Sequence, residues 1–110
     1  MKKIPLSSQQ RKSLRGIAHH LNPIVAVSER GLSAGIVEET ERALDDHELI
    51  KVKVFDNDRA VRTLIATELA QKTASVVLQK IGKIAVLYRK NPNADIKLSN
   101  VSRYMSAKDF

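Results

Sequence analysis

The chain has 110 residues, of which 43% are hydrophobic and none is cysteine, and its net charge is +7 at pH 7. A chain of this length predicts a single domain with its own core, and the absence of cysteine excludes disulfides and thiolate metal ligands. No apolar run approaches the ~18 residues of a membrane span, and the basic start Met1-Lys2-Lys3 is not followed by the apolar segment of a signal peptide, so we expect a soluble, cytoplasmic protein.

The first predicted element is an amphipathic helix from Ser8 to about His20. Ser7 followed by Gln10 matches a capping box, which marks a helix start. The residue before a proline avoids the helical region, so the pair Asn22-Pro23 ends this segment. The apolar positions recur at helical spacing and predict the buried face: Leu14, Ile17, Ala18 and Leu21.

A short apolar run, Ile24 to Val27, predicts a buried strand, and the polar loop Ser28 to Gly31 follows it. Ser33 can then cap a second helix over about Ala34 to Asp46. The expected buried stripe of this helix is Ile36, Val37, Thr40, Ala43 and Leu44, while its carboxylates face water.

The segment Leu49 to Phe55 alternates as a strand does, with Ile50, Val52 and Val54 on one face and Lys51, Lys53 and Phe55 on the other. Asn57 or Asp58 can cap a third helix over about Arg59 to Lys72. The residues of this helix that we expect to point inward are Val61, Leu64, Ile65 and Leu69.

Two further strands are predicted at Ser75 to Ile81 and at Ile84 to Arg89. The pair Gly82-Lys83 between them suits a type II′ hairpin turn. Asn91-Pro92-Asn93 then breaks the pattern and few apolar residues follow, so we expect a flexible tail over residues 91–110.

The resulting order is α-β-α-β-α-β-β within residues 1–90. It predicts an α/β (α+β) fold, in which one compact domain holds a four-stranded mixed sheet packed with helices. Any parallel neighbours should be joined by right-handed crossovers.

Charge is distributed unevenly along the chain. Residues 1–22 carry +5 without a single acid, residues 23–50 carry −5, and residues 51–90 carry +6. The net charge of +7 makes nucleic acid or an anionic membrane the leading partner classes, and the lack of a membrane-spanning run leads us to expect RNA and no membrane. The acidic segment leaves an alternative open, in which the second helix docks a ribosomal or other basic protein.

Residues that could carry catalysis are sparse. An active site needs a convergent set of acid, base, nucleophile or metal ligands. His19 and His20 are adjacent on a helix and point in different directions, and His47 lies near a helix C-terminus, where the dipole favours it. We therefore expect no enzymatic activity, no metal, no cofactor and no small-molecule substrate.

The loop Ser28-Glu29-Arg30-Gly31 joins a strand to a helix start, where free amides and the helix dipole suit phosphate. Gly31 permits a close backbone approach, and Arg30 adds a forked donor. Aromatic residues make up only 4% of the chain, which favours backbone contacts over base stacking. The candidate RNA-binding residues are Arg11, Lys12, Arg15, Ser28, Glu29, Arg30, Gly31, Lys51 and Lys53.

Five segments between about Leu6 and Lys90 carry a family resemblance: Leu14-Arg15-Gly16-Ile17-Ala18-His19, Pro23-Ile24-Val25, Gly31-Leu32-Ser33-Ala34-Gly35, His47-Glu48-Leu49-Ile50-Lys51-Val52-Lys53 and Ile81-Gly82-Lys83-Ile84-Ala85-Val86-Leu87-Tyr88-Arg89. In this order and spacing they resemble a bacterial stand-alone CRM domain, named for chloroplast RNA splicing and ribosome maturation.

The resemblance implies a fold akin to the C-terminal domain of translation initiation factor three and a loop comparable to the G-x-x-G loop of KH domains. It also implies binding of structured, ribosomal RNA during large-subunit assembly, and we expect the protein to act as a monomer. Family members have glycine at both ends of that loop, whereas this chain has Ser28 at the first position and an acid, Glu29, at the second. This departure shifts the expected binding toward Arg11, Lys12 and Arg15.

Overall fold

The computed structural model describes residues 6–104. The seven predicted elements are confirmed, each within about two residues, and one short helix follows them. The elements are α1 (Ser8–Ala18), β1 (Pro23–Val27), α2 (Ala34–His47), β2 (Leu49–Val54), α3 (Arg59–Lys72), β3 (Val76–Ile81), β4 (Ile84–Tyr88) and α4 (Asn100–Tyr104).

The four strands form one mixed sheet in the order β1-β2-β4-β3. β1 and β2 pair in parallel across the α2 crossover, and β4 pairs antiparallel with both β2 and β3. The two outer strands are therefore β1 and β3, and the connection through α3 carries the chain from β2 past β4 to the far edge.

Short-range chemistry begins each long helix where the sequence predicts it. The Ser7 hydroxyl accepts the Gln10 amide, and the Gln10 side chain accepts the Ser7 amide, so the capping box is present. Ser33 caps α2 by accepting the Ile36 amide, and Asp58 caps α3 in the same way.

The hairpin between β3 and β4 also follows its sequence signature. Gly82 has a φ of +56°, and Lys83 does not share this positive φ. This combination agrees with the predicted type II′ turn, in which the first central residue must tolerate a positive φ.

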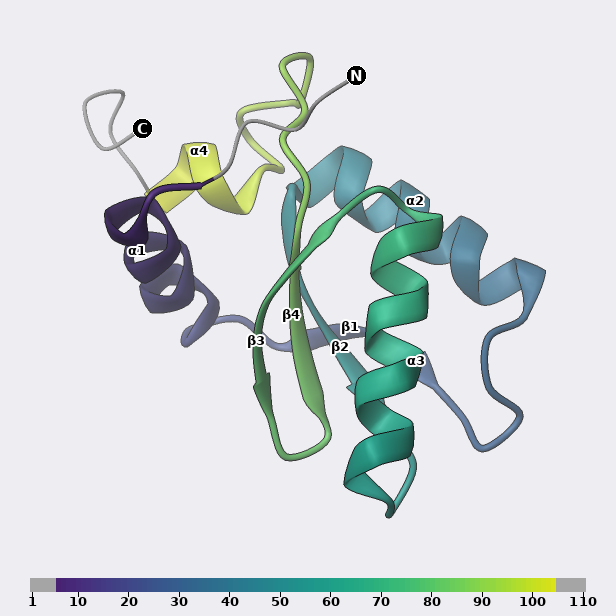
Figure 1. The fold of residues 1–110 in the computed structure, drawn as a ribbon. Helices are drawn as coiled ribbons and strands as arrows, with labels where there is room; N and C mark the ends of the chain where they lie inside the picture. The colour runs from purple at the N-terminus through teal and green to yellow at the C-terminus, as the bar shows by residue number, and fades with distance from the viewer. Residues whose placement is uncertain (1–5, 105–110) are drawn as a thin grey trace.

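The sheet has a separate hydrophobic core on each face, and the fold therefore has three layers (Figure 1). The helices α2 and α3 cover one face over Val52, Leu87 and other buried strand residues. The helices α1 and α4 cover part of the other face, over Leu49 and Tyr88. Among residues 6–104, helices cover one end of this second face, where Leu49 is buried, and leave the other end open, where Phe55 is 41% exposed.

Two expectations about burial are wrong. Leu64 is 70% exposed, because the buried face of α3 is made by Ala66, Leu69 and Ala70, and a residue two positions from Ala66 lies about 200° around the helix. The apolar run in β1 is not fully buried either, since β1 is an outer strand and Ile24 is 45% exposed.

The expected flexible tail is wrong for residues 91–104, which pack back onto the domain. The amide of Asn91 and the hydroxyl of Ser99 both donate to the buried carboxylate of Glu48, at 2.8 and 2.7 Å. The Asn100 side chain donates to the carbonyl of Leu49, and Val101 enters the core beneath α1. The remainder of the predicted tail, residues 105–110, lies outside the described residues.

Candidate nucleic-acid interface

The first cluster of candidate residues lies on α1. Arg11 and Arg15 are one helical turn apart and half-buried, and Lys12 is exposed. The opposite side of α1 is anchored by Leu14, Ile17 and Ala18 in the second core. Within the described range every carboxylate ion pair involves Arg89, so none of the three α1 cations is neutralised by an acid there.

Lys51 and Lys53 lie on the same face of the sheet as α1. The alternation along β2 places them with Leu49, which contacts α1, and opposite Ile50, Val52 and Val54. Both lysines are half-buried. The Lys53 ammonium lies 4.8 Å from the centre of the Phe55 ring, which is within cation–π range.

The loop Ser28 to Gly31 has a geometry that its sequence alone does not reveal. The Ser28 carbonyl accepts the Gly31 amide at 2.9 Å, and the Ser28 hydroxyl accepts the Arg30 amide at 3.3 Å. Gly31 has a φ of +77°, which an L side chain rarely adopts. The loop is thus a closed turn held by its first residue.

This turn changes what the loop can offer to phosphate. The expectation that the loop amides clamp RNA backbone is weakened, since Ser28 already uses the amides of Arg30 and Gly31. The first turn of α2 is also capped by Ser33. The exposed guanidinium of Arg30 is therefore the charged donor that the loop presents to solvent.

α1 and the two lysines share one face of the sheet, and the loop Ser28–Gly31 begins beside the end of β2. α1 covers the Leu49 end of β2, the two lysines follow along the strand, and Phe55 marks its other end. There the Phe55 amide donates to the Val27 carbonyl at 2.9 Å, which holds the end of β2 beside the start of the loop. The route along Leu49 to Phe55 is about 20 Å long at ~3.3 Å per residue.

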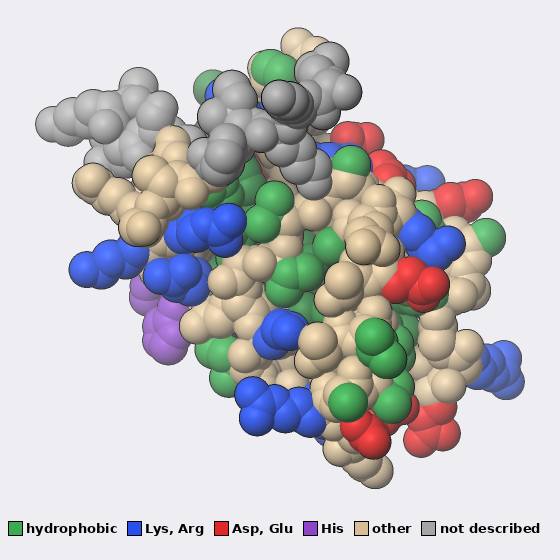
Figure 2. Space-filling view, in the orientation of Figure 1, with side chains coloured by type: hydrophobic (Ala, Val, Ile, Leu, Met, Phe, Trp, Pro, Cys, Tyr) green, Lys and Arg blue, Asp and Glu red, His purple; other side chains and the backbone are tan. Residues whose placement is uncertain are grey.

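Basic and acidic side chains gather on different parts of the surface. Figure 2 shows basic side chains over α1 and toward the β3–β4 hairpin, on the left of the view. Most acidic side chains in that view lie on the right, over α2 and α3.

The acidic helix has a structural task that the sequence did not indicate. Arg89, at the end of β4, binds the Glu41 carboxylate at 2.6 Å and the Asp45 carboxylate at 2.8 Å. Its guanidinium also donates to the carbonyls of Glu41 and Thr73. Two of the carboxylates on α2 are therefore engaged within the domain.

The histidines do not converge. The rings of His19 and His20 meet edge to face, and His47 hydrogen-bonds through Nδ1 to the carbonyl of Leu98 at 2.8 Å. Across residues 6–104 no group of three His, Cys, Asp or Glu side chains is arranged to hold a metal ion. No helix in that range has the length and apolar character to cross a membrane.

The sequence is similar to those of a known protein family. The family model of the CRS1 / YhbY (CRM) domain matches residues 6–89. The chain is 46% identical over 99 residues to the Probable RNA-binding protein PA4753 of Pseudomonas aeruginosa, covering 90% of this chain and 95% of that protein. It is 35% identical over 94 residues to the Probable RNA-binding protein YqeI of Bacillus subtilis, covering 84% and 98%.

A solved structure has the same fold. The solution structure of SAV1595 from Staphylococcus aureus superimposes with a TM-score of 0.73 at 30% sequence identity. The match covers 83% of this chain and 95% of that one.

Proposed function

The chain belongs to the CRS1/YhbY (CRM) domain family, and on this basis we propose that it binds structured RNA through the face formed by α1, Lys51, Lys53 and the loop Ser28–Gly31. The observation that carries the proposal is the unneutralised charge of Arg11, Lys12 and Arg15 on a helix that borders an open sheet face. Several relatives named as RNA-binding proteins support it.

The proposed mechanism is electrostatic. Cations that contact RNA phosphates release condensed counterions, and this release supplies most of the sequence-independent affinity. The α1 cations would bind the backbone at one end of the face, and Arg30 would bind it at the other. Lys51 and Lys53 would act between them as secondary contacts.

We further propose that the RNA is ribosomal and that the protein acts as a cytoplasmic monomer in assembly of the large ribosomal subunit. A face that reads backbone rather than bases suits a folded RNA whose shape supplies the selectivity. The chain has few aromatic residues, and the exposed Phe55 ring already makes a cation–π contact with Lys53. Both observations favour contacts with the RNA backbone over base stacking.

The alternative partner, a basic protein docked on α2, has less support. Arg89 already occupies Glu41 and Asp45, which leaves a smaller acidic surface around Glu38 and Glu39. Charge reversal of Glu38 and Glu39 to Lys should leave association with ribosomal particles intact. Loss of association in this variant alone would favour the protein-docking function instead.

The central experiment measures binding to transcribed fragments of large-subunit ribosomal RNA across a salt series. Replacing Arg11, Lys12 and Arg15 by Ala should lower the slope of log affinity against log salt by about 2 to 3, at ~0.9 per lost phosphate contact. The matched control replaces Arg42, Lys72 and Lys90 by Ala, which removes the same charge from exposed positions elsewhere. Equal slopes for the two triple variants would contradict the assignment of α1.

Crosslinking in cells, with sequencing of the attached RNA, tests the ribosomal part of the proposal. Enrichment of large-subunit ribosomal RNA is the expected result. Crosslinks distributed over messenger or transfer RNA would retain RNA binding but refute the role in subunit assembly.

A further inference from the structure

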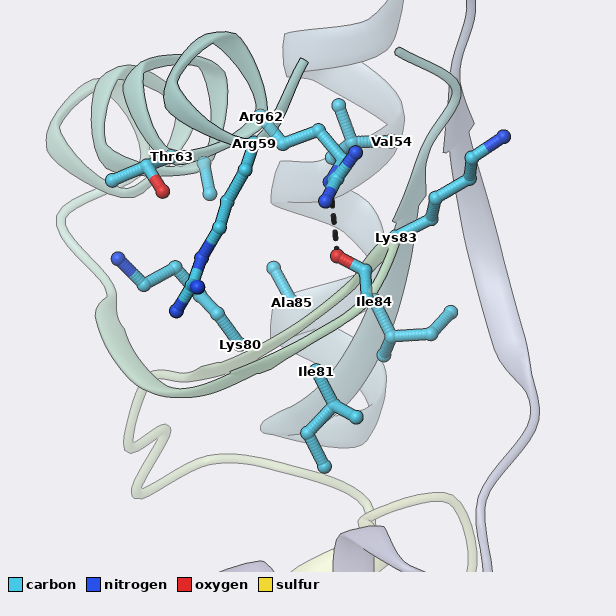
Figure 3. Close-up of a pocket in the computed structure, with 11 residues that line it drawn as sticks. Val54, Arg59, Arg62, Thr63, Lys80, Ile81, Lys83, Ile84 and Ala85 are labelled. Carbon is cyan, nitrogen blue, oxygen red and sulfur yellow. Dashed lines mark hydrogen bonds between the residues drawn. The ribbon is translucent and has the colours of Figure 1, made fainter. Parts of the chain in front are cut away.

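A cavity lies between the first turn of α3 and the β3–β4 hairpin, outside the face described above (Figure 3). Its volume is about 510 Å³, within the range of ~300–1,000 Å³ that is usual for ligand sites. Four cationic side chains line it: Arg59, Arg62, Lys80 and Lys83. We call it the hairpin cavity.

One of these cations builds the wall of the cavity. Arg62 donates from Nε to the Gly82 carbonyl at 3.0 Å and from Nη1 to the Asp56 carbonyl at 2.8 Å. These two bonds join the hairpin tip to the loop before α3. The guanidinium is therefore held in place by the backbone of two separate segments.

Two other cations converge without an acid between them. In Figure 3 the charged ends of Arg59 and Lys80 point into the same part of the cavity, from α3 and from β3, whereas Lys83 points away. Within the described range neither residue forms an ion pair.

The acidic side chains before α3 accept hydrogen bonds from backbone amides. Asp56 accepts the amide of Asp58, and Asp58 accepts the amides of Ala60 and Val61 at the start of α3. Like charges brought together from separate elements repel each other unless an anion lies between them.

The position of the hairpin cavity connects it to the proposed RNA face. The Val54 amide donates to the Lys83 carbonyl at 2.7 Å, and the next amide, that of Phe55, donates to the Val27 carbonyl. The hairpin, the loop before α3 and the loop Ser28–Gly31 thus lie together at the same end of the strands. In open α/β sheets, the carboxyl ends of parallel strands are the usual place for ligands.

We propose that the hairpin cavity binds one phosphate group of the RNA backbone between Arg59 and Lys80, while Arg62 holds the hairpin in place. The proposal rests on the RNA-binding function above and extends it to a second site. A forked guanidinium beside an ammonium matches the several acceptor oxygens of a phosphate. The cavity lies on the α3 side of the sheet, so an RNA strand that crosses the face from α1 would reach it by passing around the ends of β2 and β4.

The test replaces Arg59 and Lys80 by Ala and leaves Arg62 intact, since Arg62 holds the hairpin. Binding of the transcribed ribosomal RNA fragments should weaken about tenfold, the loss expected for one charge-assisted contact. The salt slope should fall by about 0.7 to 0.9. The control, Arg42→Ala with Lys72→Ala, removes one Arg and one Lys from exposed helix positions and should bind as the native chain does.

The failures of the two proposals are distinguishable. If the double variant keeps native affinity and slope while the α1 triple variant loses both, the cavity is not an RNA site but the face is. If the native chain fails to bind any of the RNA fragments, the proposed function itself is wrong.

A second measurement needs no variant and so does not depend on folding of the mutant. A short RNA hairpin with a double-stranded stem, added to ¹⁵N-labelled native chain, should shift the backbone amide signals of Thr63, Gly82 and Lys83. Unmoved signals would overturn the proposal. Shifts with a poly-glutamate peptide but not with the RNA would also overturn it, in favour of an acidic protein segment.

Discussion

The guanidinium of Arg89 lies 2.6 Å from the carboxylate of Glu41, and this ion pair ties the end of β4 to the middle of α2. The same side chain donates to the Thr73 carbonyl at 2.7 Å, just beyond the end of α3. One partly buried cation, with 18% of its side chain exposed, therefore joins both helices on that face of the sheet to the central strands.

Replacement of Arg89 by Ala should destabilise the domain by about 2 to 3 kcal/mol, because two carbonyl groups and two carboxylates lose a charged donor. Arg89→Lys should recover little, since one ammonium cannot reach all four acceptors. Urea unfolding measures both effects. Lys90→Ala, at the exposed neighbouring position, is the control, and an Arg89→Ala variant as stable as that control would refute this role.

Val101→Ala should cost about 1 to 2 kcal/mol of unfolding free energy, since Val101 is 9% exposed and packs beneath α1. Ile96→Ala truncates a residue of the same segment that is 72% exposed and should leave the stability unchanged. The pair is compared by thermal or urea unfolding. Equal stabilities would mean that α4 adds nothing to the core.

Glu29→Lys should tighten binding to the ribosomal RNA fragments about three- to tenfold at low salt, because it replaces a repelled charge by an attracted one. The gain should vanish as salt is raised. Glu68→Lys makes the same charge change on the exposed side of α3 and should have the smaller effect. An equal gain in both variants would show that net charge matters and the loop does not.

The titration of Tyr88 gives a prediction for alkaline pH. Burial, reinforced by the negative charge of Glu48, raises the pKa of the Tyr88 phenol from 10.0 to about 12. The folded state then holds this proton more tightly than the unfolded state. The stability that depends on it is complete below pH 10 and is lost as the pH rises toward 12.

Absorbance of tyrosinate in a Tyr104→Phe variant isolates the Tyr88 titration. The expected midpoint is near pH 12, or the pH at which the protein unfolds if that comes first. A midpoint near pH 10, with the fold intact, would contradict the predicted environment. Tyr88→Phe should lose less stability than the native chain across the same interval.

Much of the fold was predictable because local rules agree with one another. Ser7, Ser33 and Asp58 each cap a helix whose apolar period begins directly after them. The alternation in β2 and the glycine of the hairpin fix the strands in the same way. These signals lie within a few residues of the elements that they specify, so a single sequence reveals them.

The tail was predicted poorly for the opposite reason. α4 has only five residues, and its Asn100 and the preceding Ser99 bond to Leu49 and Glu48, about fifty positions earlier. No local pattern encodes such contacts. The apolar residues of the segment are also divided between a buried Val101 and an exposed Ile96, which gives no clear period.

The candidate site was predictable only in part. The cations of α1 and β2 are visible as charges without nearby acids in the sequence. The roles of Arg62 and Arg89 are not visible, since each bonds backbone groups of other segments. The hydrogen bonds that Ser28 accepts within the loop depend on the geometry of the turn. The presence of serine in place of the family's glycine did not predict them.

The contact between the first and last helices has one more consequence. Because α1 and α4 lie against each other, the chain enters and leaves the domain on the same side of the sheet (Figure 1). The last described helix therefore helps to hold the basic helix α1 in place, through the apolar cluster that Val101 shares with Leu14 and Ile17.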